Sequence, residues 1–111
     1  MYFQNKINSS KQEKIFQEAL LKAINESLLV LGPSVKQAVY YHIERQYNIK
    51  HEEIPFKLKE FYEALKDIFG FGSKVIEKLF VKKLYEHLGL RFEEHEDWSF
   101  IEYVEFAKNF G

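Results

Sequence analysis

Residues 69–89 read FGFGSKVIEKLFVKKLYEHLG, an apolar segment with glycines at both ends. Over residues 73–88 the apolar side chains cover most of the circumference of a helix. The exception is a narrow strip of lysines at helical spacing, formed by Lys74, Lys78 and Lys82. A helix that is apolar nearly all round belongs in the middle of a bundle. The segment therefore predicts a central helix that other helices surround.

Glycines mark both ends of this predicted helix. Gly70 is expected to adopt the left-handed conformation that ends the preceding helix, and Gly72 to complete the turn. Ser73 is expected to cap the new helix, and Gly89 to end it as Gly70 ends its predecessor. The apolar residue after each closing glycine can pack back on the preceding turn, which in the first case is Phe71. These signals favour a tight corner between neighbouring helices.

Four more helices are expected from apolar residues that recur at helical spacing. The predicted helices span residues 10–31, 34–47 and 57–69, with a last helix from residue 99. Ser10 and Glu13 form a possible capping box at the first of them, and Gly32 followed by proline ends it. The connector 48–56 contains charges and a proline, so it does not fit a central strand.

The strongest local signal precedes the last helix. Ser99 is placed at the N-cap with Glu102 three residues later, the spacing of a reciprocal capping box. Trp98 and Tyr103 flank this box at the positions of a hydrophobic staple. We therefore expect this helix to begin at a well-defined point.

The chain has the length and composition of one globular domain. Its 111 residues suffice for one hydrophobic core, and 46% hydrophobic with 30% charged residues is an ordinary globular composition. We predict an all-α fold, a compact bundle of about five helices with short helix-turn-helix corners. Residues 1–9 are expected to form a frayed N-terminus and residues 10–111 a single helical domain.

Charge and cysteine content exclude several classes of site. With 16 basic and 17 acidic side chains, the chain has no global attraction for nucleic acid or an anionic membrane. The absence of cysteine excludes disulfides, thiolate catalysis and cysteine-ligated metals. No run approaches the length of a membrane span, and the first residues lack the features of a signal peptide. A cytoplasmic protein that does not bind membranes is expected.

The Gly-Ser-Lys sequence at residues 72–74 does not fit a phosphate loop. A Walker loop needs Gly-Lys-Ser/Thr after a buried strand, and the dinucleotide fingerprint needs a third glycine. The segment that precedes residue 70 is a predicted helix instead. Lys74 and Lys78 nevertheless oppose the helix dipole unless an anion or Glu77 compensates them. A small-ligand or anion sensor at Lys74 therefore stays open as an alternative function.

His42 is the histidine with the clearest alternative roles. It lies on the apolar side of the predicted helix 34–47, where an imidazole must find a hydrogen-bond partner. A satisfied core or interface histidine is favoured over a catalytic base, and with Tyr41 it forms the other candidate ligand region. The stretches 51–53 and 93–97 are interpreted as solvated acidic connectors rather than metal sites. No catalytic residue, metal site or cofactor is assigned, and the chain is predicted not to be an enzyme.

The lysine strip gives a second alternative, a weak nucleic-acid binder. Lys74, Lys78 and Lys82 could contact phosphates without reading the base sequence, and binding would then depend on salt. The same face carries no arginine, glutamine or asparagine for base contacts, and the helix is too apolar to lie exposed in a groove. A solvated strip is the favoured interpretation, so nucleic acid is not an expected partner.

Aromatic residues make up 17% of the chain, more than a domain of this length buries easily. Those that fall outside the predicted apolar stripes are Tyr40 or Tyr41, Tyr85 and Phe106. Large amphipathic rings are efficient interface anchors. We therefore expect a protein partner or self-association, through the helix 34–47 or the last helix.

Four segments of the chain together resemble a known family of small helical domains. They are LGPSVKQAVYYHIE (31–44), IP (54–55), FYEAL (61–65) and IFGFGSKVIE (68–77). The likeness spans most of the chain and is to archaeal helical domains of unknown function, of the Nitrosopumilus output domain type. The resemblance implies an archaeal, intracellular module for signal output or protein interaction, with no catalytic residues to carry over. The leading prediction is a non-enzymatic protein-interaction or signal-output domain.

Overall fold

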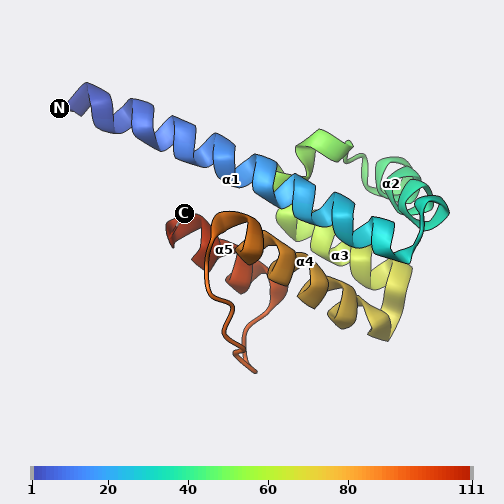
Figure 1. Cartoon of the computed structure of the whole chain (residues 1–111). Helices are drawn as coiled ribbons and strands as arrows, with labels where there is room; N and C mark the ends of the chain where they lie inside the picture. The colour runs from blue at the N-terminus through green and yellow to red at the C-terminus, as the bar shows by residue number, and fades with distance from the viewer. Residues whose placement is uncertain (1, 111) are drawn as a thin grey trace.

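Five α-helices and two short 3₁₀ helices make up the fold, and residues 2–110 contain no strand (Figure 1). In chain order they are α1 (Tyr2–Leu31), α2 (Pro33–Tyr47), η1 (His51–Phe56), α3 (Leu58–Phe69), η2 (Gly70–Gly72), α4 (Ser73–Leu88) and α5 (Phe100–Phe110). This computed structural model describes the backbone of residues 2–110 and the side chains of residues 11–110. The predicted all-α bundle is confirmed.

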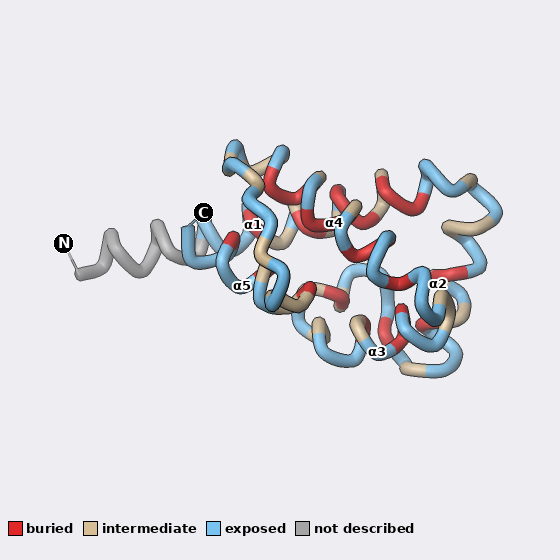
Figure 2. The backbone as a smooth tube through the Cα atoms, turned by 90° about the horizontal axis from the view of Figure 1, so that it is seen from below, coloured by how far each residue is buried: buried red, intermediate tan, exposed pale blue. Residues whose placement is uncertain are grey.

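The hydrophobic core lies around α4, which packs against α1, α3 and α5 and runs antiparallel to α1 (Figures 1 and 2). Phe80 and Leu84 of α4 are fully buried. Phe61 of α3 stacks on Phe80 with ring centroids 6.0 Å apart, and Phe100 of α5 meets Phe80 at 6.1 Å. Three helices thus meet at one ring cluster, which places the most apolar helix in the middle as its sequence predicts.

Most helix boundaries agree with the sequence pattern. α4 begins at Ser73 and ends at Leu88 as predicted, and α2 and α3 match their predicted ranges to within one residue. The connector 48–56 contains η1 rather than a strand, and Ile54 within it is buried. The connector therefore adds a small piece of core, while its polar residues Lys50, His51 and Glu52 stay exposed.

α1 begins at Tyr2, so the predicted helix start at Ser10 is wrong. Residues 2–9 contain no proline or glycine, so nothing in their sequence stops a helix from extending through them. The predicted capping box of Ser10 with Glu13 rests on a side chain outside the described residues. The frayed N-terminus expected for residues 1–9 stays a prediction; the backbone of residues 2–9 belongs to α1, and Met1 lies outside the described residues.

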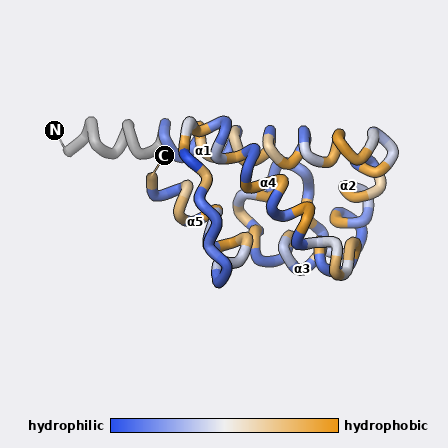
Figure 3. The backbone as a smooth tube through the Cα atoms, turned by 60° about the horizontal axis from the view of Figure 1, so that its bottom comes forward, coloured by the Kyte–Doolittle hydropathy of each residue, from blue (hydrophilic) through white to orange (hydrophobic). Residues whose placement is uncertain are grey.

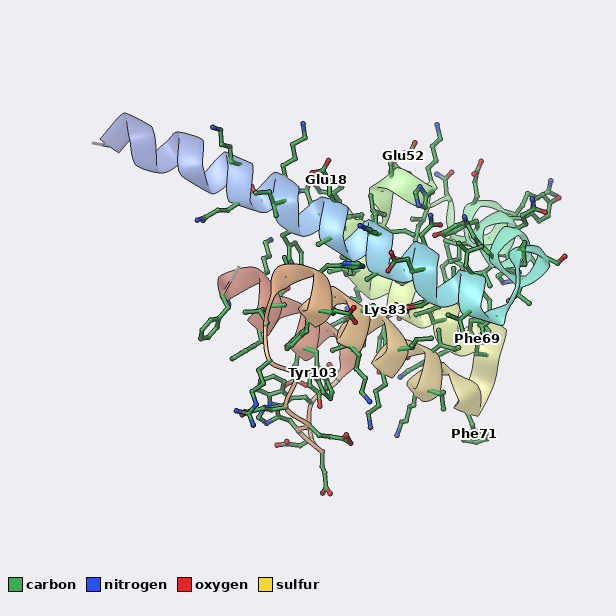
Figure 4. The ribbon with its side chains drawn as sticks, in the orientation of Figure 1. Glu18, Glu52, Phe69, Phe71, Lys83 and Tyr103 are labelled. Carbon is green, nitrogen blue, oxygen red and sulfur yellow. The ribbon has the colours of Figure 1, made fainter. Side chains whose placement is uncertain are left out.

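The turn between α3 and α4 differs from the prediction. Gly70 has the positive φ that favours glycine, but its φ of 57° and ψ of −128° are not those of a left-handed helix cap. Gly72 has a φ of −71°, which any residue adopts. Ser73 is the buried first residue of α4 and makes no capping hydrogen bond. Because η2 carries the chain around this corner, Phe71 is fully exposed instead of packed on α3 (Figure 4).

The other two glycine corners form as expected. Gly89 adopts the left-handed conformation, and the following Leu90 N–H donates to the Tyr85 carbonyl at 2.8 Å. Leu90 is also partly buried against the core. Gly32 stands before α2 with a φ of 121°, a value that side chains strongly disfavour.

The capping box and staple predicted before α5 are both present. Ser99 N–H donates to Glu102 Oε1 at 2.9 Å, and Glu102 N–H donates to Ser99 Oγ at 3.3 Å. Trp98 and Tyr103 meet edge to face with ring centroids 5.1 Å apart. The N-terminal end of α5 is therefore fixed next to the segment that connects it to α4.

Candidate functional site

The segment 91–99 between α4 and α5 is a hydrophilic run that is tied to both helices (Figure 3). The hydroxyl of Tyr103, labelled in Figure 4, donates to the His95 carbonyl at 2.9 Å and accepts from the His95 N–H at 2.7 Å. Lys78 of α4 pairs with Glu94 at 2.6 Å. The interpretation of residues 93–97 as a solvated connector is thus incomplete, because specific bonds fix the middle of this segment.

Two hollows open beside this segment, and His95 and Trp98 line both of them. The two rings stack with centroids 3.8 Å apart. The first hollow, named the Glu77 pocket, is lined by residues that include Tyr62, Lys74, Glu77, Lys78, Trp98 and Phe100. The second, named the Phe106 groove, is lined by residues that include Tyr85, Leu90, Arg91, Trp98, Phe106 and Phe110.

The Phe106 groove has a volume of about 190 Å³ and aromatic walls. The ring of Phe106 lies 5.4 Å from that of Trp98 and 4.9 Å from that of Phe110. Phe106 is 39% exposed and Phe110 67% exposed, so the exposure expected for Phe106 is confirmed. Arg91 and Glu93, both exposed, place opposite charges at the same groove.

Tyr85 is buried, so its expected exposure is wrong. Only 2% of its surface is accessible, because α5 and Phe92 cover the ring. Its hydroxyl donates to the Tyr103 carbonyl at 2.8 Å. Burial raises the pKa of Tyr85 to about 12. Tyr85 therefore belongs to the wall of the Phe106 groove and to the core at once, and it is not a free surface anchor.

The Glu77 pocket has a volume of about 260 Å³ and lies among α3, the N-terminal half of α4, the segment 91–99 and the start of α5. Glu77 is only 7% exposed. Its Oε2 atom is buried and has no hydrogen-bond partner among the described residues. Burial raises the pKa of Glu77 above its ordinary value, although the Ser73 hydroxyl and the charges of Lys66 and Lys74 act in the opposite direction.

The three lysines of the predicted strip have different surroundings. Lys74 is exposed and lines the Glu77 pocket together with Lys78. Lys78 is paired with Glu94, and its charge and hydrogen bond lower the pKa of that carboxyl. Lys82 lies over the ring of Phe92, 5.6 Å from its centroid. The structure therefore brings two of the lysines to one pocket and leaves the third outside it.

The candidate region around His42 is less enclosed. His42 is half-buried and lines a depression with Gln46, Tyr47 and Asp67. Tyr41 is 65% exposed and is not part of that depression. Tyr40 is half-buried instead, with its hydroxyl donating to Asn25 Oδ1 at 3.0 Å, and burial raises its pKa to about 12. The three residues therefore do not converge on one ligand site.

One local sequence signal marks Glu77. In the sequence, Phe80 and Val81 follow Glu77 at the spacing of one helical turn, which places the carboxylate on an apolar side of the helix. The structure buries Glu77 on that side of α4. A charged residue between buried neighbours is unusual in a helix and often marks a site. No comparable local signal exists for Glu94 or His95, which reach the pocket because the chain reverses after α4.

Comparisons with known proteins give no match. No protein-family model matches the chain, and no curated protein or solved structure is significantly similar to it. Within the described residues, no group of three or more His, Asp or Glu side chains could hold a metal ion. No helix of that part of the chain is long and apolar enough to cross a membrane. The geometry of the two hollows is therefore the basis for a functional proposal.

Proposed function

We propose that this chain is a non-enzymatic interaction module that associates with a second copy of itself through the Phe106 groove. The observation that carries this proposal is a pair of exposed rings, Phe106 and Phe110, one turn apart on α5 and beside an aromatic groove. Neighbouring rings already restrict both side chains, so a partner that covers them loses little conformational freedom. Aromatic rings in such positions are typical anchors of protein interfaces.

The charges around the groove support a second copy as the partner. A twofold interface joins the same surface of two molecules, so that surface must be complementary to itself. Arg91 and Glu93 provide both signs of charge at one groove. Across a twofold axis, Arg91 of one copy can therefore face Glu93 of the other. The formal net charge of −1 adds little long-range repulsion between copies.

The resemblance to the Nitrosopumilus output domain type extends the proposal to an archaeal, cytoplasmic setting and to signal output. A module of this kind passes on a signal by gaining or losing a protein contact rather than by chemistry. The exposed rings on α5 are the surface that would make such a contact.

The first prediction concerns the mass of the protein in solution. Light scattering at protein concentrations from about 10 μM to about 1 mM should show the average mass rising towards that of a dimer. Dissociation constants in this range are expected of a small interface. The double variant Phe106→Ser with Phe110→Ser should stay monomeric, because it removes both exposed rings. Phe71→Ser is the matched control, since Phe71 is fully exposed but lies outside the groove.

Two results would contradict this proposal. A wild-type chain that stays monomeric throughout that range would exclude the second copy as the partner. Association that survives the double variant but is lost in Phe71→Ser would place the interface at the corner between α3 and α4 instead.

A further inference from the structure

Glu77 lines a pocket that the proposed self-association does not use, and it carries a buried acceptor. The side chain is 7% exposed, and Oε2 has no hydrogen-bond partner among the described residues. Buried polar atoms in folded proteins almost always have a partner, and a carboxylate oxygen can only accept unless it is protonated. A ligand that satisfies this atom must therefore bring a hydrogen-bond donor into the pocket.

The walls of the Glu77 pocket suit a cation. Tyr62 and Phe100 stack with ring centroids 6.2 Å apart and planes 14° from parallel. The Lys66 Nζ atom, which does not line the pocket, already lies over the Tyr62 ring, 4.4 Å from its centroid. Trp98 and Tyr103 provide two further rings, 5.1 Å apart. Rings of this kind attract a cation through their electron-rich faces, and they do so more strongly where water is excluded. A hydrogen-bond donor that is also a cation would be stabilised both by the Glu77 carboxylate and by the aromatic rings.

The charges of the pocket point the same way. Lys78 is already paired with Glu94, and Glu96 is another carboxylate among the lining residues. An anion held by Lys74 would lie in the same pocket as the buried Glu77 carboxylate and would be repelled by it. The predicted anion site at Lys74 is therefore less favourable than a site for a positively charged group.

We infer that the Glu77 pocket binds a small primary amine in its ammonium form, with an apolar or aromatic body, and that Glu77 accepts hydrogen bonds from the ammonium group. The volume of about 260 Å³ is below that of pockets for drug-sized molecules, so the ligand is small. A bound ammonium offsets the burial that raises the pKa of Glu77. The site is separate from the contact proposed at Phe106 and Phe110, which do not line it.

The test is a titration followed by nuclear magnetic resonance in a buffer without amines, with 2-phenylethylamine as the probe. Resonances of residues that line the pocket should shift on saturation, whereas 2-phenylethanol, which has the same body without the charge, should shift them much less. Glu77→Gln should weaken amine binding about tenfold or more, because a charge-assisted hydrogen bond is lost. Glu86→Gln is the matched control, since Glu86 is exposed on the same helix and should leave binding unchanged.

A second variant covers the case in which Glu77→Gln does not fold. Tyr62→Leu keeps an apolar wall but removes a ring face, and it should weaken amine binding several-fold while 2-phenylethanol is affected less. Inorganic phosphate is the competing probe. Phosphate shifts in the pocket without amine shifts would assign an anion site at Lys74 and overturn the inference. Equal amine affinity in Glu77→Gln, or no shift with about 10 mM amine, would overturn it as well.

Discussion

At the scale of single residues, Glu77 connects burial to pH. Desolvation disfavours the ionised carboxylate, so the pKa of Glu77 in the folded state is raised above its ordinary value of 4.5. At a pH between the ordinary pKa of Glu77, which applies to the unfolded chain, and its raised pKa in the folded chain, the folded chain binds more protons than the unfolded chain. Ionisation therefore costs stability in this case, and the contribution of Glu77 to the free energy of unfolding falls as the pH rises through that window.

Replacing this carboxylate by an amide should stabilise the protein near neutral pH. We expect Glu77→Gln to raise the free energy of unfolding by about 1 kcal/mol at about pH 7, because a neutral amide loses less hydration on burial. The gain should fade as the pH falls through 4.5, because Glu77 then becomes protonated in the unfolded state as well. Urea denaturation between about pH 4 and about pH 8, in a buffer without amines, measures this.

Glu86→Gln again serves as the control and should show no such pH dependence, because Glu86 is exposed. If Glu77→Gln proved less stable than the wild type near neutral pH, Glu77 would have a partner that satisfies its carboxylate.

At the scale of elements, local sequence predicts α5 well and the corner before α4 poorly. The capping box of α5 needs only Ser99 and Glu102, three residues apart, and both bonds form. At the corner, a glycine suits a left-handed cap and a 3₁₀ turn equally well. The choice depends on how α3 and α4 pack together, which no short window contains. The same limit explains why Phe71, predicted to pack on α3, is fully exposed.

α5 should be sensitive to the loss of its cap. A helix of 11 residues is marginal by itself, so its end contacts matter to its stability. We expect Ser99→Ala to lower the free energy of unfolding by about 1 kcal/mol and to speed amide exchange at Glu102. Chemical denaturation and hydrogen exchange measure these effects.

Ser34→Ala is the matched control, because Ser34 is an exposed serine in the first turn of α2 and α2 has no side-chain cap. Equal losses in the two variants would mean that the bonds at Ser99 add nothing beyond helix propensity.

At the scale of the whole molecule, the central place of α4 follows from its sequence, but the two hollows do not. Apolar residues on nearly all sides of a helix require neighbours on all sides. The Glu77 pocket instead depends on the chain reversal that brings Glu94 to Lys78, and on the bonds between Tyr103 and His95. The two residues of each pair lie well apart along the chain, and no regular sequence spacing predicts that they meet. Lys74 and Lys78 could be predicted as a pair, but not their acidic and aromatic surroundings.

The core around α4 should be the least tolerant part of the protein. Phe80 is fully buried and contacts rings from α3 and α5, so Phe80→Ala should lower the free energy of unfolding by about 3–5 kcal/mol. Val75, on the same helix but 72% exposed, is the control, and Val75→Ala should change stability by about 0.5 kcal/mol or less. Thermal and urea unfolding measure both variants. Similar losses in the two variants would show that α4 is not the centre of the core.

Trp98 gives the protein a built-in fluorophore at the place where both hollows meet. It is the single tryptophan of the chain and lines both the Glu77 pocket and the Phe106 groove, with its indole stacked on His95. Indole emission responds to the polarity and charge around the ring. One emission spectrum, without any label, therefore reports on a ligand in one hollow and on a protein contact at the other, and a titration of each in the presence of the other reads out whether the two events are coupled.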